Sequence, residues 1–223
     1  MCGIVGYFGN NDAVPLLIKG LKRLEYRGYD SAGLAIMSGD SFMVNKKAGK
    51  VAELESLVSE SELTGSVGIG HTRWATHGEP SDLNAHPHTD YSGKFALIHN
   101  GIIVNYEDIW DTLNSKPKFK IDSEVIIGIA IDHLENGGEF NDIPKKVLGL
   151  CKGTISCALA IPSMGKLVLF SNNGSLYTGS INDAKYFASE RFPVQSLGCT
   201  DIKQIWEEGY FIDILKLEDI NVS

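Results

Sequence analysis

The second residue of the chain, Cys2, carries the strongest chemical signal in the sequence. A methionine that precedes a small residue is normally removed during maturation, and its removal would leave Cys2 with a free α-amine. Such an amine has a reference pKa of about 7.7–8.0, so it is an available base near neutral pH. A thiol and a base on one residue form a self-contained nucleophile pair. Taken alone, Cys2 is equally compatible with a small residue near a chain end.

Two neighbouring segments contain residues that could work with this nucleophile. Residues 71–80 have the sequence HTRWATHGEP, and residues 84–88 have the sequence NAHPH. Arg73 could equally be a surface ion-pair residue, and the histidines at 71, 77, 86 and 88 could be polar loop residues that bind no ligand. The pair His86 and His88 could ligate a metal, but no carboxylate or thiolate completes a recognisable set. We therefore predict no metal site.

A third segment, His99-Asn100-Gly101, follows an apolar run. An Asn side-chain amide and a Gly backbone N–H at a strand end suit an oxyanion hole, because both donors can converge on a developing negative charge. As an isolated dipeptide, Asn-Gly is more often a plain turn. Both interpretations stay open at this point.

The elements that would position these groups follow from the hydrophobic periodicity. Strands are predicted at residues 3–8, 31–37, 41–45, 66–72 and 94–99, and again at 153–161, 166–171, 176–178 and 185–188. Helices are predicted at about 12–26, 51–60, 105–113, 123–134 and 143–150. Residues 73–90 are polar and contain two prolines, which predicts a long functional or disordered loop. Strands, then helices, then strands predict a layered α+β fold.

The composition limits the classes of protein to consider. The chain has 223 residues, of which 43% are hydrophobic, and shows no linker, so we predict one domain. A net charge of −8 argues against a nucleic-acid or anionic-membrane surface. No apolar stretch approaches the ~20 residues of a membrane helix, and the start does not resemble a secretory signal. The four cysteines form no CxxC pair and are interpreted as free thiols, so a cytosolic location is predicted.

Five motifs, in order, resemble the class II glutamine amidotransferases, and most closely the glutaminase half of the glutamine–fructose-6-phosphate aminotransferase family. They are MCGIVG at the start, RLEYRGYDSAG at 23–33, HTRWATHGEPS at 71–81, NAHPH at 84–88 and HNGI at 99–102. The resemblance is close to about residue 130 and is limited to the strand pattern after residue 150. It implies the N-terminal-nucleophile hydrolase fold, a four-layer αββα sandwich of two facing antiparallel sheets. Residues 2–223 would form one type-2 glutamine amidotransferase domain.

The resemblance also implies a role for each matching residue. Cys2 would be the nucleophile, and Asn100 and Gly101 would form the oxyanion hole. Arg73 would hold the α-carboxylate of L-glutamine, a task suited to a bidentate guanidinium, and Asp122 would bind the α-ammonium. The remaining residues are Trp74, Thr76, His77 and Gly78, in a loop that closes over glutamine, and Arg27 and His86, in supporting positions.

Two positions near the predicted ammonium site need separate comment. Asp122 can also be interpreted as the N-cap of the helix predicted to start at Ser123, and both roles can hold together. Ser123 departs from the threonine that the family commonly has. Because the hydroxyl is kept, we expect little effect.

Together these residues predict hydrolysis of the glutamine side-chain amide through a Cys2 γ-glutamyl thioester, with no cofactor, once Met1 is removed. The ammonia would pass to a sugar-phosphate isomerase or synthase domain, or to a separate subunit, and a different acceptor stays open. We find no candidate for the phosphate-binding loops of such an isomerase, so the chain would be an excised domain or a stand-alone glutaminase. The alternative of another class is a glutamine-binding regulatory module. Such a module needs no oxyanion hole, which argues against it.

Overall fold

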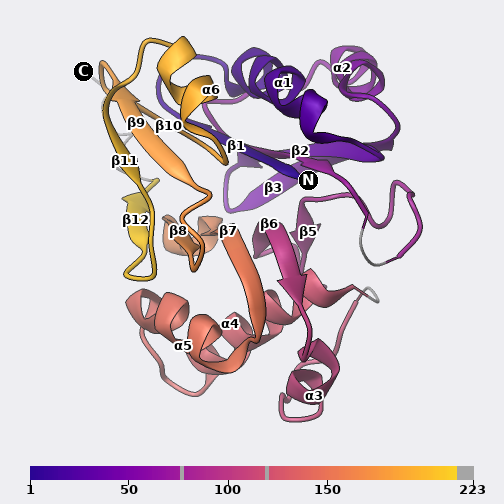
Figure 1. Ribbon diagram of the computed structural model, residues 1–223, viewed down its shortest axis with the longest axis vertical. Helices are drawn as coiled ribbons and strands as arrows, with labels where there is room; N and C mark the ends of the chain where they lie inside the picture. The colour runs from indigo at the N-terminus through magenta and orange to yellow at the C-terminus, as the bar shows by residue number, and fades with distance from the viewer. Residues whose placement is uncertain (76–77, 119–120, 215–223) are drawn as a thin grey trace.

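Two antiparallel sheets face each other in the computed structural model, which describes residues 1–75, 78–118 and 121–214 (Figure 1). The first sheet has the strand order β11-β9-β10-β1-β4-β2-β3, and the second has the order β12-β8-β7-β6-β5. The strands of the first sheet are β1 (Gly3–Phe8), β2 (Ser31–Ser38), β3 (Ser41–Ala48), β4 (Val67–Arg73), β9 (Tyr177–Ile181), β10 (Ala184–Ala188) and β11 (Thr200–Gln204). Those of the second are β5 (His88–Thr89), β6 (Ala96–Ile103), β7 (Gly153–Ile161), β8 (Lys166–Ser171) and β12 (Tyr210–Asp213).

Helices cover the outer face of each sheet (Figure 1). The first sheet is covered by α1 (Ala13–Leu24), α2 (Val51–Glu60) and α6 (Arg191–Ser196). The second is covered by α3 (Tyr106–Trp110), α4 (Val125–Glu135) and α5 (Ile143–Leu150). Short 3-10 turns lie at Glu25–Arg27, Asp122–Glu124, Phe140–Asp142 and Pro162–Met164. The predicted αββα sandwich is confirmed.

Strand alternation divides the apolar side chains between the layers. In β1, Val5 and Tyr7 pack under the helices, whereas Ile4 and Phe8 point into the core between the sheets. Both faces of β1 are therefore buried, which explains why its sequence is apolar throughout. Phe8 stacks on Phe187 of β10, with the ring centroids 5.8 Å apart.

The first helix forms as its sequence predicts. The Asp12 carboxylate accepts a hydrogen bond from the Val14 backbone N–H at 3.2 Å and so caps the helix. The apolar positions that recur every three or four residues, Val14, Leu17, Ile18, Leu21 and Leu24, are all buried against the sheet.

Strand β6 runs further than predicted. It continues to Ile103, and Asn100 and Gly101 lie opposite Ser156 and Ile155 of β7, so the interpretation of Asn-Gly as a turn is wrong. The physical reason is the partner strand, whose hydrogen-bonding groups extend past Gly101 and hold the segment straight.

Other differences are local. The helix predicted at 105–113 is shorter, and the loop predicted at 73–90 begins one residue later and contains β5. The strands β5, β11 and β12 and the helix α6 were not predicted. Within the described ranges, no helix is long and apolar enough to cross a membrane.

Candidate active site

The alternation of three strands places the predicted site residues on the facing surfaces of the two sheets. In β4, Val67 and Ile69 point into the core between the sheets, so His71 and Arg73 lie on the same side. Because side chains two residues apart lie on the same face, Cys2 lies on the face of Ile4, and Asn100 lies on the face of Ile98. The polar residues thus continue the apolar core toward one end of the sandwich.

Backbone pairing brings Cys2 next to the end of β4. Gly3 lies opposite Thr72, so the residue before Gly3 adjoins Arg73. The Cys2 Sγ accepts a hydrogen bond from the Trp74 backbone N–H at 3.2 Å and lies 3.6 Å from the Trp74 carbonyl oxygen. The sulfur is therefore held beside Trp74, directly after the end of β4.

Burial raises the pKa of the Cys2 thiol above its ordinary value of 9.0, and the carboxylate of Asp30 acts in the same direction. The hydrogen bond from Trp74, the positive N-terminus and Arg73 lower this pKa, but they do not offset burial. Met1 is present, and its ammonium donates to the Arg27 carbonyl oxygen at 2.6 Å. In the chain that retains Met1, the thiol is thus protonated at neutral pH.

The second sheet supplies the predicted oxyanion-hole residues. The Asn100 side-chain Nδ2 donates to the Cys2 carbonyl oxygen at 3.1 Å. Gly101 lines a cavity of about 20 Å³ together with Cys2, Arg73, Trp74, His86, His99, Ile121, Asp122 and Ser123. This cavity has room for about one water molecule, so binding a whole amino acid requires the walls to move. A larger cavity of about 590 Å³ beside α4 is lined by none of the predicted site residues.

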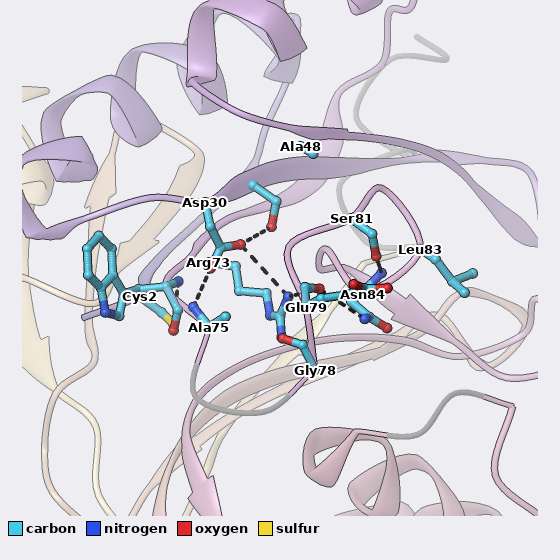
Figure 2. A network of polar contacts seen from close by, with 12 residues as sticks. Cys2, Asp30, Ala48, Arg73, Ala75, Gly78, Glu79, Ser81, Leu83 and Asn84 are labelled. Carbon is cyan, nitrogen blue, oxygen red and sulfur yellow. Dashed lines mark hydrogen bonds and ion pairs between the residues drawn. The ribbon is translucent and has the colours of Figure 1, made fainter.

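The guanidinium of Arg73 is held by its own loop. Its Nη2 donates to the Gly78 carbonyl oxygen at 3.0 Å, and its Nη1 donates to the Glu79 carbonyl oxygen at 3.3 Å (Figure 2). These neutral acceptors occupy positions that a carboxylate would fill with stronger, charge-assisted hydrogen bonds. Arg73 is buried and therefore oriented before any ligand arrives.

Asp30 also belongs to this network, although the sequence analysis gave it no role. Its Oδ1 lies 3.8 Å from Arg73 Nη1, and its Oδ2 accepts a hydrogen bond from the Ala75 backbone N–H (Figure 2). Its backbone N–H donates to the Arg73 carbonyl oxygen at 2.7 Å. Asp30 thus ties the guanidinium to the start of the loop. The position of Asp30 within the motif at residues 23–33 is the sequence feature that could have indicated this role.

Asp122 is buried in the 3-10 turn that precedes α4. Its Oδ2 accepts a hydrogen bond from the Ile103 backbone N–H at 2.8 Å, at the end of β6. Neither the turn nor α4 has a side-chain cap, so the interpretation of Asp122 as a helix N-cap is wrong. The neighbouring Ser123 hydroxyl lies 2.8 Å from His99 Nδ1, so the hydroxyl at this position orients a buried ring.

Of the histidines that one interpretation placed in a polar loop, His71 and His88 lie on the strands β4 and β5, whereas His86 lies in the loop before β5. All three are buried; the rings of His71 and His86 stack at 4.2 Å, and those of His86 and His88 meet edge to face at 4.2 Å. Burial lowers the pKa of His71 to about 3 and lowers those of the other two well below 6.5. Among the described residues, no group of three or more His, Cys, Asp or Glu side chains is arranged to hold a metal.

The other predicted residues that the structure describes are Arg27, Trp74 and Gly78. Arg27 Nη1 pairs with Glu190 at 3.1 Å, and its backbone holds the chain start. Trp74 is 53% exposed and packs on Gly28, where an added Cβ would meet the indole at 2.3 Å. Gly78 has a φ of +72° and presents its carbonyl to Arg73. Thr76 and His77 lie outside the described residues.

Comparison with known proteins gives consistent matches. A family profile described as a glutamine amidotransferase domain matches residues 71–195. A protein of Bacteroides thetaiotaomicron named glutamine–fructose-6-phosphate aminotransferase [isomerizing] is 43% identical over 100% of this chain and 37% of its own length. A protein of the same name from Thermococcus kodakarensis is 40% identical over 86% of this chain and 33% of its own length. The chain therefore spans about a third of the length of these relatives.

Solved structures share the fold. Glutamine phosphoribosylpyrophosphate amidotransferase from B. subtilis aligns with a TM-score of 0.77 at 23% identity, over 96% of this chain and 49% of its own. A structure described as the allosteric regulatory enzyme of purine biosynthesis aligns with a TM-score of 0.76 at 26% identity, over 91% of this chain and 44% of its own.

Proposed function

The chain belongs to the glutamine amidotransferase domain family, and on that premise we propose that it hydrolyses the side-chain amide of L-glutamine to glutamate and ammonia. The observation that carries the proposal is the convergence of both sheets on one cavity. The first sheet contributes Cys2 and Arg73, and the second contributes Gly101 and the adjoining Asp122. The Asn100 side-chain amide donates a hydrogen bond to the backbone carbonyl oxygen of Cys2.

Substrate binding uses the two charged residues. The α-carboxylate of glutamine replaces the carbonyl oxygens of Gly78 and Glu79 on the Arg73 guanidinium, because an ionised acceptor binds a guanidinium more strongly than a neutral one. Asp122 receives the α-ammonium. Since both groups are buried, an analogue that lacks either α-group loses one charge-assisted contact with the site and should bind much more weakly than glutamine.

The chemistry uses Cys2 after Met1 has been removed. The α-amine accepts the thiol proton, and the sulfur attacks the amide carbon. Asn100 has two side-chain N–H donors, so one can stay on the Cys2 carbonyl while the other, with the Gly101 N–H, meets the oxyanion. The α-ammonium then returns this proton to the leaving nitrogen as the tetrahedral adduct collapses, so the C–N bond breaks and ammonia is released. Water then hydrolyses the γ-glutamyl thioester to glutamate and regenerates the thiol.

We also propose that the ammonia serves amino-sugar synthesis. The support is the name shared by the relatives and the fact that the chain matches about a third of their length. A sugar-phosphate isomerase domain or subunit would then receive the ammonia. Three points remain predictions: that residues 2–223 form one glutamine amidotransferase domain, that the individual residues have the roles named above, and that the protein is cytosolic. No specific observation favours a non-catalytic glutamine-binding module.

Release of glutamate tests the proposal. The chain is purified with its N-terminus verified by mass spectrometry as Cys2, and glutamate formed from glutamine is measured. We expect turnover by this protein, none by Cys2→Ala, and slow turnover by a preparation that retains Met1, because the base is then missing. If verified Cys2 protein releases no more glutamate than Cys2→Ala, the proposal is wrong.

A further inference from the structure

His71 lies behind the proposed oxyanion hole without lining the cavity. It is on β4, is fully buried, and points toward the second sheet. Its Nε2 lies 3.0 Å from the His99 carbonyl oxygen and 3.0 Å from Asn100 Oδ1. The mechanism described above gives this residue no task.

The surroundings fix which nitrogen of His71 carries the proton. The His99 carbonyl oxygen can only accept, so Nε2 must be the protonated nitrogen. Nδ1 has no hydrogen-bond partner, and an unprotonated Nδ1 avoids leaving a buried donor unsatisfied. Burial lowers the pKa of His71 to about 3, so the ring is neutral at physiological pH and has one N–H donor.

This N–H in turn fixes the orientation of the Asn100 amide. Because Nε2 donates, the Asn100 atom facing it must be the oxygen. The amide nitrogen then faces the opposite way, toward the Cys2 carbonyl oxygen, which can only accept. An N–H donor at one end of the amide and a carbonyl acceptor at the other therefore agree on a single amide orientation.

We infer that His71 is a positioning residue for the proposed glutaminase reaction: its Nε2–H holds the Asn100 amide so that the N–H donors face the reacting carbon at Cys2. The inference rests on the proposed function and deepens it. Without this hydrogen bond the amide can rotate and present its oxygen to the oxyanion, which repels the developing charge. A misplacement of about 1 Å in a catalytic group can cost about 10²-fold in rate.

A matched pair of substitutions tests the inference. His71→Gln keeps an N–H donor near the position of Nε2, whereas His71→Met has similar length and no donor. We expect kcat for glutamine hydrolysis to fall by about 10- to 10²-fold in His71→Met and by less than about 5-fold in His71→Gln. KM should stay within about 3-fold in both, because His71 does not line the cavity.

A double-mutant experiment with Asn100 distinguishes a positioning role of His71 from a general packing role. In an Asn100→Ala background, His71→Met should lower kcat less than about 2-fold further, because no amide remains to be oriented. Equal kcat in the Gln and Met variants, or the same loss with and without Asn100, would overturn the inference. If His71→Met does not fold, His71→Phe takes its place, since it keeps an aromatic ring against His86. A wild-type protein without glutaminase activity would instead refute the proposed function.

Discussion

At Cys2, burial and the Asp30 carboxylate raise the pKa of the thiol, whereas the nearby positive charges and a backbone hydrogen bond lower it. Burial is the largest effect and raises the pKa, whereas the Trp74 N–H and Arg73 lower it. A protonated thiol is a weak nucleophile, so the residue needs a base. The geometry is consistent with an α-amine in that task, because the backbone nitrogen of Cys2 belongs to the same residue as the sulfur.

The raised pKa gives a pH prediction for the chain that retains Met1. The thiolate fraction grows about tenfold per pH unit below the pKa, so alkylation of Cys2 by iodoacetamide should accelerate about 10²-fold from pH 7 to pH 9. Mass spectrometry of the Cys2 peptide measures this rate. The buried Cys151, whose pKa burial raises to about 12, is the internal control and should react far more slowly. A rate that is constant between pH 7 and pH 9 would contradict the prediction.

At the scale of elements, the pairing of β6 with β7 fixes the proposed oxyanion-hole residues, Asn100 and Gly101. Gly101 has a φ of +146°, and a Cβ at this position would lie 1.7 Å from the Thr154 carbonyl oxygen. No rotation of a side chain relieves this contact, because the obstructing atom is backbone of the paired strand. The position therefore requires glycine because any side chain would clash with the backbone of the paired strand.

Substitution of Gly101 tests this constraint. We expect Gly101→Ala to lower the free energy of unfolding by about 2–4 kcal/mol and glutaminase activity by at least about 10²-fold, because the strand must shift. Urea unfolding and the glutamate assay measure the two effects. Gly39→Ala is the control, since Gly39 also has a positive φ, of +58°, but nothing lies within 4 Å of the added Cβ. It should cost only about 1–2 kcal/mol and leave activity unchanged. Equal effects in the two variants would be inconsistent with the proposed clash.

The 78–85 loop is the second element that matters for the site. The Asp82 Oδ1 accepts from the Ala48 backbone N–H at 2.6 Å, and Lys46 Nζ donates to the Leu83 carbonyl oxygen at 2.9 Å. These contacts dock the loop on the end of β3. The docked loop presents the Gly78 and Glu79 carbonyls to Arg73, so the element that occupies the guanidinium is anchored outside the cavity.

At the scale of the whole molecule, the site depends on the distance between two sheets. The core that separates them includes Ile4, Phe8, Ile98 and Phe187. Cys2 and Asn100 continue the same strand faces, so the packing of this core determines how far the proposed nucleophile lies from its proposed oxyanion donor.

Removal of one large core side chain should therefore lower the stability of the sandwich. Phe187 is fully buried between the sheets, and Phe187→Ala should lower the free energy of unfolding by about 3–5 kcal/mol. Urea unfolding followed by both fluorescence and circular dichroism measures the loss. Phe192→Ala is the matched control, since its side chain is 63% exposed, and it should change stability by less than about 0.5 kcal/mol. A similar loss in both variants would show that the core between the sheets does not carry this stability.

The sequence by itself determined the elements with strong periodicity and the identity of the chemical groups. Val14 to Leu24 predicted a helix face, β1 and β7 were predicted with their observed bounds, and the motifs pointed to Cys2, Arg73 and Asn100. These features depend on neighbours in the chain, which a sequence displays directly. The short strands β5, β11 and β12 carry little periodic signal and form because a neighbouring strand offers unpaired hydrogen-bonding groups.

Only the tertiary structure decided how the groups meet. The extension of β6 past Gly101, the Asp122 contact to Ile103 and the ties from Asp30 to Arg73 and from His71 to Asn100 join residues distant in the sequence. The physical reason is that a buried polar group must find a partner wherever the packed sheets place one, and that place is set by sheet pairing rather than by local propensity.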